Sequence, residues 1–310
     1  MPVLPRVGYL GPEGTFSEEA LLASASEQAV EPVALATLYD TVMAVRRGEV
    51  EWALVPIENS LDGSVTITLD VLAGEAEELQ IVGEELLTVR HALIAREQLE
   101  PGEIETVLSH PQVPGQCTRF LRTELARAQV LPASSTAEAV RIVANGSART
   151  TAALGTRLAA EIYGAVVIRA DVQDRDDNET RFVWLARGSA EATGTGGGGG
   201  GGDHGESGGL DGARRPPLRT PPSGRWKTSL VFWGPGADSP GWLVRCLDEF
   251  ARREINLTKI ESRPRRERMG HYMFFVDFEG RLREDSVGNA IAGLRKLCQH
   301  AYVLGSYPAV

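Results

Sequence analysis

Several features that mark common enzyme classes are missing from this 310-residue sequence. It has three cysteines, Cys117, Cys246 and Cys298, and no CxxC pair, so neither a zinc site nor a disulfide framework is indicated. It has no dinucleotide fingerprint and no phosphate loop with its lysine. No run approaches the roughly 20 apolar residues of a membrane span, and a signal peptide's long apolar region is missing. We therefore expect a cytoplasmic protein with reduced thiols and no cofactor or metal.

The charge balance argues against two further classes of partner. The formal net charge is −10 and the sequence pI is about 5.2, so neither nucleic acid nor an anionic membrane is an expected partner. A basic run at residues 263–268 contains a proline and a glutamate but no aromatic residue, which is typical of a solvated loop. A small anionic substrate would need a local cationic pocket or one lined by N–H groups.

A glycine-, proline- and serine-rich segment divides the sequence. Residues 188–224 include an unbroken glycine run at 196–202 and too few apolar residues to offset the entropy of ordering. We expect a flexible linker with a reach of about 30–35 Å. It separates a domain at residues 1–187 from a domain at residues 225–310, each long enough to bury a core.

Before the linker, short apolar runs alternate with helical patterns, which indicates an α/β architecture with a largely parallel sheet. The predicted strands are Arg6–Leu10, Val33–Leu35, Trp52–Ile57, Leu79–Val89, Ile104–Leu108, Ala152–Leu154 and Val166–Ile168. The predicted helices are Phe16–Ser26, Leu38–Arg46, Gln116–Ala128, Thr136–Ala144 and Thr156–Tyr163. The region is large for one sheet, so two lobes are expected.

After the linker, the pattern predicts the β-α-β-β-α-β order of a ferredoxin-like fold. The elements are strand Trp226–Trp233, helix Gly241–Arg253, strands Asn256–Glu261 and His271–Phe278, helix Asp285–Cys298 and strand Ala301–Ser306. A unit of this size and order is more often a binding or regulatory module than a catalyst.

Polar clusters follow several predicted strands and precede helices, where open α/β sheets bind ligands. They are Gly11–Ser17, Val55–Ser60, Ser109–Gln112 with Gln116 and Cys117, and Ser134–Thr136. Each has an ordinary explanation in helix capping or turn chemistry. His110 and Cys117 fit structural roles better than those of a base and a nucleophile. The shared location of the clusters nevertheless indicates a cleft site.

A fifth segment, Asn178–Phe182, places a hydroxyl beside a guanidinium at the entry to an apolar strand. This pairing suggests a reaction on a small anion, with Thr180 as proton donor or dipole. The alternative is a solvated strand edge.

Together, Gly11–Ser17, Pro56–Ser60, Ser109–Gln112 with Gln116 and Cys117, and Thr180–Phe182 resemble the prephenate dehydratase family. The resemblance implies a two-lobed, periplasmic-binding-protein-like catalytic domain, with lobe one at about 1–88 and 167–187 and lobe two at about 89–166. It implies cofactor-free conversion of prephenate to phenylpyruvate with loss of water and carbon dioxide, a step of L-phenylalanine biosynthesis. Thr180 is then the catalytic hydroxyl. The expected substrate-binding residues are Thr15, Asn59, Ser60, Ser109, Gln116, Arg181 and Phe182.

The segment Asn256–Pro264 resembles the effector-binding signature of an ACT regulatory domain. The resemblance implies modulation by phenylalanine and a homodimer or homotetramer. The expected effector-binding residues are Gly241, Leu243, Asn256, Leu257, Glu261 and Ser262. One departure is Trp242, a large indole where the family has a methyl group, so that effector binding is weakened, altered or lost. The long linker is another, because a flexible tether transmits little and coupling then requires direct contact between the domains.

Two alternatives stay open at this stage. An arogenate dehydratase would use the amino analogue of prephenate and yield phenylalanine directly. A non-catalytic amino-acid sensor would have the same two-lobed fold and ACT module but would bind its ligand without turnover. Intact Thr180 and Gln116 argue against the sensor.

Overall fold

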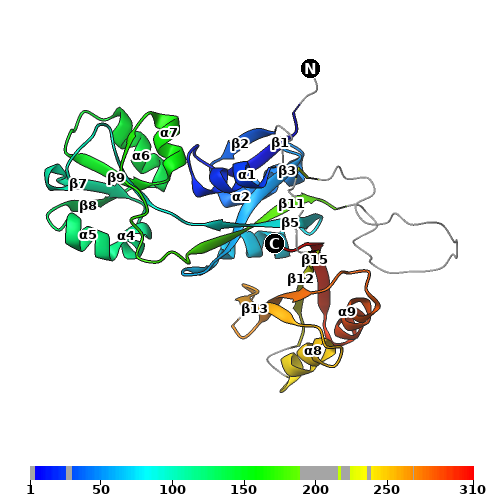
Figure 1. The fold of residues 1–310 in the computed structure, drawn as a ribbon. Coiled ribbons are helices and arrows are strands. Elements are labelled where there is room, and N and C mark those ends of the chain that lie inside the picture. The colour runs from blue at the N-terminus through cyan, green and yellow to red at the C-terminus, as the bar shows by residue number, and fades with distance from the viewer. Residues whose placement is uncertain (1–3, 26–29, 189–215, 218–223, 236–238, 268) are drawn as a thin grey trace. The chain divides into compact units, whose positions relative to one another are not determined.

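The structure is a computed structural model that describes residues 4–25, 30–188, 216–217, 224–235, 239–267 and 269–310 (Figure 1). The chain forms two compact units. Unit 1 draws on residues 1–41, 54–66 and 85–182, and unit 2 on residues 42–53, 67–84 and 183–310. The predicted linker at 188–224 lies outside the described residues, apart from 188, 216–217 and 224.

The first sheet has the strand order β2-β1-β3-β11-β5, with β4 paired to β3. Strands β1 and β2 run parallel. The elements of this region are β1 (Arg6–Leu10), α1 (Phe16–Ser24), β2 (Glu31–Leu35), α2 (Leu38–Arg47), β3 (Trp52–Asn59), β4 (Gly63–Ser64), α3 (Thr66–Gly74), β5 (Leu79–Thr88) and β11 (Glu179–Arg187). The long strands β3 and β11 are buried over most of their length, as their continuous apolar runs predict. Their polar ends, at Asn59 and at Glu179, lie side by side and carry the candidate site.

The second sheet lies in unit 1 and has the order β10-β6-β9-β7-β8. Its elements are β6 (Ala92–Ala95), η1 (Pro101–Glu103), β7 (Thr106–Ser109), α4 (Val113–Gln116), α5 (Thr118–Glu124), β8 (Gln129–Pro132), α6 (Thr136–Asn145), β9 (Thr151–Gly155), α7 (Arg157–Tyr163) and β10 (Val166–Arg169). One face packs on α4 and α5 and the other on α6 and α7.

The prediction of a largely parallel sheet is wrong for this part of the chain. Strand β7 is parallel to β8 and β9, but β6 is antiparallel to both β9 and β10. The reason is β6, which the sequence prediction missed. It follows β5 after only three residues and enters a different sheet, where it lies between β9 and β10 and runs antiparallel to both.

The third sheet lies in unit 2 and has the order β13-β14-β12-β15, with antiparallel pairing. Its elements are β12 (Trp226–Trp233), α8 (Trp242–Ala251), β13 (Leu257–Pro264), β14 (Tyr272–Glu279), α9 (Asp285–Leu297) and β15 (His300–Pro308). The predicted β-α-β-β-α-β order is therefore confirmed for the described residues. Helices α8 and α9 cover one face, where Phe232, Phe250 and Phe278 form the centre of the core.

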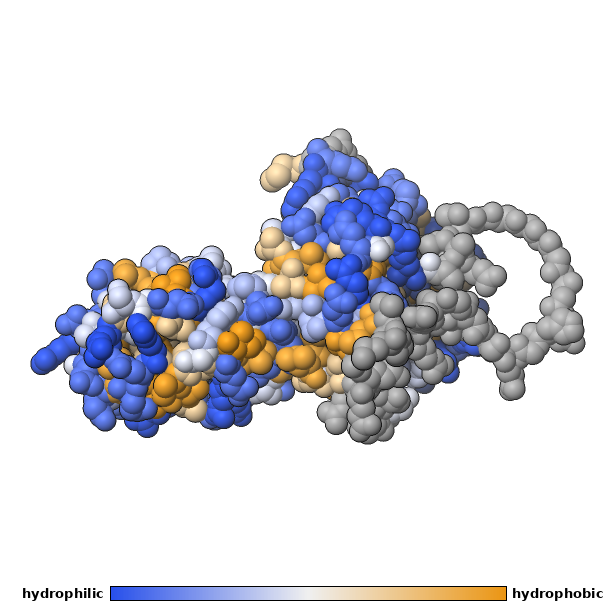
Figure 2. Space-filling view, turned by 90° about the horizontal axis from the view of Figure 1, so that it is seen from above, coloured by the Kyte–Doolittle hydropathy of each residue, from blue (hydrophilic) through white to orange (hydrophobic). Residues whose placement is uncertain are grey.

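Among the described residues, no helix is long and apolar enough to cross a bilayer. Hydrophilic residues occupy much of the face shown in Figure 2, and hydrophobic residues form smaller patches between them.

Candidate functional site

The ends of β3 and β11 bring three polar residues into contact, of which Asn59 and Thr180 are predicted site residues. Asn59 Nδ2 donates to Asn178 Oδ1 at 2.9 Å and to Thr180 Oγ1 at 3.0 Å. It also lies 3.2 Å from the Glu179 carbonyl oxygen. The Asn59 Oδ1 accepts the backbone N–H groups of Leu61 and Asp62, so the loop after β3 fixes the orientation of the amide.

A third side-chain amide joins this group from α4. Gln116 Oε1 accepts from Asn178 Nδ2 at 3.0 Å and lies 2.9 Å from His91 Nε2. Gln116 Nε2 donates to Asp62 Oδ2 at 3.2 Å. Residues far apart in the sequence thus form one continuous hydrogen-bonded line. We call it the polar chain and define it as Thr180, Asn59, Asn178, Gln116 and His91.

The polar chain is electrically neutral. Burial holds the pKa of His91 below its ordinary value, so the ring is uncharged near neutral pH, and the other four side chains do not titrate there. The Thr180 hydroxyl accepts from Asn59, and among the described residues it meets no acceptor for its own hydrogen. That hydrogen is free to donate to a ligand.

Two of the predicted substrate contacts serve local structure. Thr15 caps α1, since its Oγ1 faces the Glu18 N–H at 3.5 Å and donates to the Leu10 carbonyl at 2.9 Å. The Glu18 carboxylate accepts the Gly14 N–H, so a side chain already occupies part of the predicted anion site. Ser60 ties β3 to β11, because its Oγ accepts the Glu179 N–H at 3.0 Å.

Ser109 is 1% exposed at the end of β7, and its hydroxyl donates to the His110 carbonyl at 3.2 Å. Within the described part of the chain, no hydrogen bond links it to the polar chain. Cys117 is fully buried, and burial raises the pKa of its thiol to about 12. A thiol that stays protonated is a poor nucleophile, which agrees with the structural role assigned to it.

Among the expected substrate contacts, Arg181 has the least support from the geometry. Successive side chains of a strand point to opposite faces, so Arg181 points away from the face that carries Thr180. Its guanidinium is buried and lies 3.6 Å from the Glu58 carboxylate. The geometry therefore supports a structural ion pair between β11 and β3 and gives no support to a substrate contact. Phe182 is 1% exposed and, two residues after Thr180 in β11, lies on the same face of the strand.

Sequence reasoning missed two members of the polar chain. Asn178 is the first residue of the segment Asn178–Phe182, in which the sequence indicates functional roles only for Thr180, Arg181 and Phe182. His91 had a usable signal, since it is a lone histidine that directly precedes the apolar run Ala92–Ala95. A histidine at the start of a buried strand is expected to find a buried hydrogen-bond partner.

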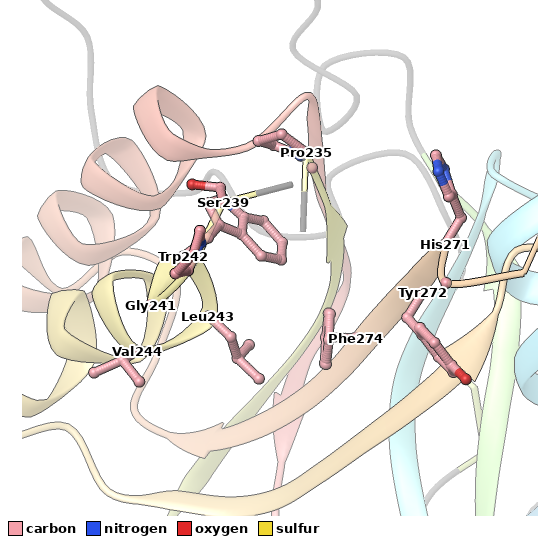
Figure 3. Close-up of a pocket in the computed structure, with 12 residues that line it drawn as sticks. Pro235, Ser239, Gly241, Trp242, Leu243, Val244, His271, Tyr272 and Phe274 are labelled. Atoms are coloured by element: carbon pink, nitrogen blue, oxygen red, sulfur yellow. The ribbon is translucent and has the colours of Figure 1, made fainter. Parts of the chain in front are cut away.

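A second site lies in unit 2 at the start of α8. A pocket of about 370 Å³ is lined by the turn before the helix, its first residues and the beginning of β14. Figure 3 shows Trp242 and Leu243 extending from the start of α8 toward the strands, with Phe274 opposite Leu243. Gly241 adopts a positive φ of 73°, which favours glycine at this turn. The volume is within the usual range for small ligands.

Trp242 lines this pocket but is anchored in the core. It is 4% exposed, and its Nε1 donates to the Leu297 carbonyl at 2.7 Å. Its ring lies against Gly234, where an added Cβ would come within 2.6 Å of the indole. The glycine at 234 thus makes room for the large ring, which packs into the core and leaves a pocket beside it.

The other predicted effector residues lie on β13 or just before it. Ser262 is paired with Phe274, a pocket residue, and shares its face of the sheet. Leu257 packs against the core, and Asn256 is exposed. Glu261 is paired with Phe275 and lies on the opposite face from the pocket, 3.5 Å from Lys259. Of the six predicted effector residues, Gly241 and Leu243 line the pocket directly.

Comparison with known proteins shows the family of this chain. Residues 7–190 match the family model described as prephenate dehydratase. The prephenate dehydratase of Mycobacterium sp. (strain JLS) is 38% identical over 315 residues, covering 98% of this chain and 89% of that protein.

Two solved structures resemble the whole chain. The prephenate dehydratase of Arthrobacter aurescens in complex with L-Phe is 32% identical, with a TM-score of 0.79 and coverage of 98% of this chain and 92% of that one. GqqA, a quorum-quenching acylase, has the same TM-score at 26% identity, with coverage of 98% of each chain. The family model spans more than half of the sequence, and the mycobacterial relative exceeds 30% identity over nearly all of it. The chain therefore belongs to the prephenate dehydratase family of hydro-lyases.

Proposed function

We propose that this protein converts prephenate to phenylpyruvate, with Thr180 as the group that assists departure of the ring hydroxyl. The polar chain carries this proposal, because it aligns a free Thr180 O–H with three fixed carboxamides. In the reaction the bond to the ring carboxylate breaks and carbon dioxide leaves. The released electron pair completes the aromatic ring while the C–O bond breaks, and the departing oxygen becomes water on taking up a proton.

A threonine hydroxyl is a very weak acid, so full proton transfer before C–O cleavage is not expected. We propose instead a hydrogen bond from Thr180 that strengthens as negative charge grows on the departing oxygen. Asn59 supports this role, because its N–H donates to Thr180 Oγ1 and directs the hydroxyl hydrogen away from the amide. The Gln116 amide nitrogen is the donor best placed to receive a substrate carboxylate, provided that the substrate displaces Asp62 from it.

The test is turnover by the purified full-length protein. Prephenate and arogenate are supplied separately and in competition, and phenylpyruvate and phenylalanine are measured. Conversion of prephenate with a higher kcat/KM than arogenate supports the proposal. Preference for arogenate identifies the alternative dehydratase, and ligand binding without product identifies the sensor. An N-acylated amide is included because an acylase shares the fold.

We further propose that residues 225–310 form an ACT domain through which L-phenylalanine inhibits the enzyme. The ferredoxin-like strand order and the pocket at Gly241 and Leu243 support this assignment. A relative of this chain was solved with L-Phe bound, which makes that amino acid the first effector to test. We propose that Leu243 and Phe274 contact its ring and that Ser262 lies beside it.

Direct contacts join the third sheet to α3 and β5 within unit 2, and a change on effector binding can be transmitted through them. The face of the third sheet that carries no helices contacts α3 and β5. Asp70 in α3 pairs with Arg263 at 2.9 Å and with Arg266 at 2.6 Å. Lys227 pairs with the buried Glu84 at 2.8 Å, and the Tyr302 hydroxyl donates to the Ala73 carbonyl.

Helix α3 begins two residues after β4, and β4 pairs with the end of β3 at Asn59. A shift of α3 is therefore communicated along a short chain segment to the loop that orients Asn59. This route does not require the linker to be ordered.

The regulatory proposal is tested by measuring L-Phe binding and inhibition separately. Calorimetry gives the dissociation constant, and initial rates with and without L-Phe give the inhibition. Light scattering in both states tests the proposed homodimer or homotetramer. Binding without any change in rate would refute the regulatory role, and no binding would indicate that Trp242 has removed the site.

A further inference from the structure

His91 holds one end of the Gln116 amide. Its Nε2 lies 2.9 Å from Gln116 Oε1, and the same oxygen accepts from Asn178 Nδ2 at 3.0 Å. The amide orientation follows from its partners, because Gln116 Nε2 faces the Asp62 carboxylate, which only accepts. An amide oxygen also only accepts, so His91 must donate, and its proton lies on Nε2.

The surroundings of His91 keep the ring in this state. The side chain is 1% exposed, and burial lowers its pKa, which favours the uncharged ring. Its Nδ1 is buried without a hydrogen-bond partner among the described residues. Phe16 packs edge-on against the ring at a centroid distance of 5.3 Å, and the His91 N–H donates to Gln173 Oε1 at 3.0 Å. The ring therefore has a single donor group, and that donor points at Gln116.

We propose that His91 is a positioning residue for the dehydration: its Nε2–H fixes the rotation of the Gln116 amide so that the amide N–H faces the substrate carboxylate. This inference rests on the proposed function of Gln116. A half-turn of the amide would place its NH₂ group against two donors, His91 Nε2–H and Asn178 Nδ2. It would also turn the amide oxygen toward the carboxylate of the substrate, which repels it. His91 touches no reacting atom and acts through Gln116.

The position of Phe16 explains part of the motif at residues 11–17. One N–H group of this turn, that of Gly14, already donates to the Glu18 carboxylate. The turn also starts α1 at Phe16, whose ring packs against His91. Gly14 has no side chain and a positive φ of 84°, and an added Cβ would lie 2.8 Å from Ala159. The motif thus helps to hold the histidine that orients Gln116.

Two matched substitutions separate positioning from packing. His91→Gln keeps an N–H donor close to the position of Nε2, whereas His91→Phe keeps a ring of similar size without a donor. We expect His91→Phe to raise KM for prephenate roughly tenfold, the effect of one lost hydrogen bond, with little change in kcat. We expect His91→Gln to restore most of that loss. Thermal melts of both variants verify that each is folded.

A double-mutant cycle identifies the partner. In a Gln116→Leu background there is no amide to orient, so His91→Phe should cause no further rise in KM. Additive effects of the two substitutions would overturn the proposal, as would equal losses in the Gln and Phe variants of His91.

The tautomer provides a readout that does not depend on the substrate. The chain contains five histidines, so ¹⁵N-histidine spectra of the ligand-free protein can be assigned by the disappearance of one signal in His91→Gln. A neutral ring with its proton on Nε2 and a pKa below the ordinary value of histidine is expected. An Nδ1–H tautomer or a charged ring would overturn the positioning role even if prephenate is turned over. The expected tautomer without prephenate turnover would show instead that the proposed function has failed.

Discussion

Replacing Thr180 with valine is the most direct test of the catalytic proposal. Valine has nearly the shape of threonine and is well suited to a strand, so the substitution removes the hydroxyl and little else. Asn59 Nδ2 loses one acceptor but keeps two, Asn178 Oδ1 at 2.9 Å and the Glu179 carbonyl at 3.2 Å. No buried donor is left without a partner. The expected loss of stability is therefore at most about 1 kcal/mol, the net value of one hydrogen bond.

The expected loss of activity is much larger. Removing a preorganised donor to a developing oxyanion costs about 2.7–4 kcal/mol, or roughly 10²–10³ in kcat. The assay compares wild type, Thr180→Val and Thr180→Ser by phenylpyruvate formation, with thermal melts of each. Serine keeps the hydroxyl and should stay within about tenfold of wild type, since it lacks only the methyl group that restricts the rotamer. A valine variant with kcat within about threefold of wild type, less than 1 kcal/mol of barrier, would refute the role of Thr180.

Three further predictions follow from contacts in the structure. Asp70→Asn removes the shared partner of two arginines and should weaken inhibition by L-Phe by at least about fivefold, the lower end of usual coupling energies, while uninhibited kcat stays unchanged. Gly234→Ala should lower stability by about 1–3 kcal/mol, because the added methyl group overlaps the Trp242 ring. Its control, Gly288→Ala in α9, meets no atom within 4 Å and should raise stability by about 0.5–1 kcal/mol. Asp62→Asn should lower KM for prephenate, because it removes the carboxylate that competes with the substrate for the Gln116 N–H group. Initial rates measure KM, and a higher KM in the variant would contradict this prediction.

The sequence predicted the elements best where local pattern and burial agree. Strand β1, strand β12 and the start of α1 were placed correctly, since each combines an apolar run with a clear turn or cap beside it. Strand β6 was missed, because a four-residue run that follows a ten-residue strand has no turn signal of its own. Helix α3 was missed for a related reason. Its nine residues include several that are β-branched, and its apolar and polar residues do not separate onto two faces, so it shows no clear helical periodicity.

The candidate site was predicted in its parts but not in its connections. Thr180, Asn59 and Gln116 were named in advance, and the structure joins them through Asn178. Arg181 was expected to bind the substrate, but a motif gives the order of residues and not the direction in which a strand places them, and its ion pair with Glu58 became visible only in the structure. His91 was not found, since the oxygen that makes its Nε2 a donor, Gln116 Oε1, and the Phe16 ring packed against it are both distant in the sequence.

The proposed regulation, like the candidate site, depends on which residues are in contact and not only on which are adjacent in the sequence. Arg263 lies within the segment that the sequence assigns to effector binding, yet it is the Arg263 guanidinium that pairs with Asp70 in α3. Because side chains alternate along β13, some residues of this segment face the pocket and others face α3. Ser262 is on the pocket face, beside Phe274, and its neighbour Arg263 is on the face that contacts α3. A ligand that moves β13 by a small distance must move both sets of contacts together. A strand that borders the pocket on one face and α3 on the other can transmit such a movement.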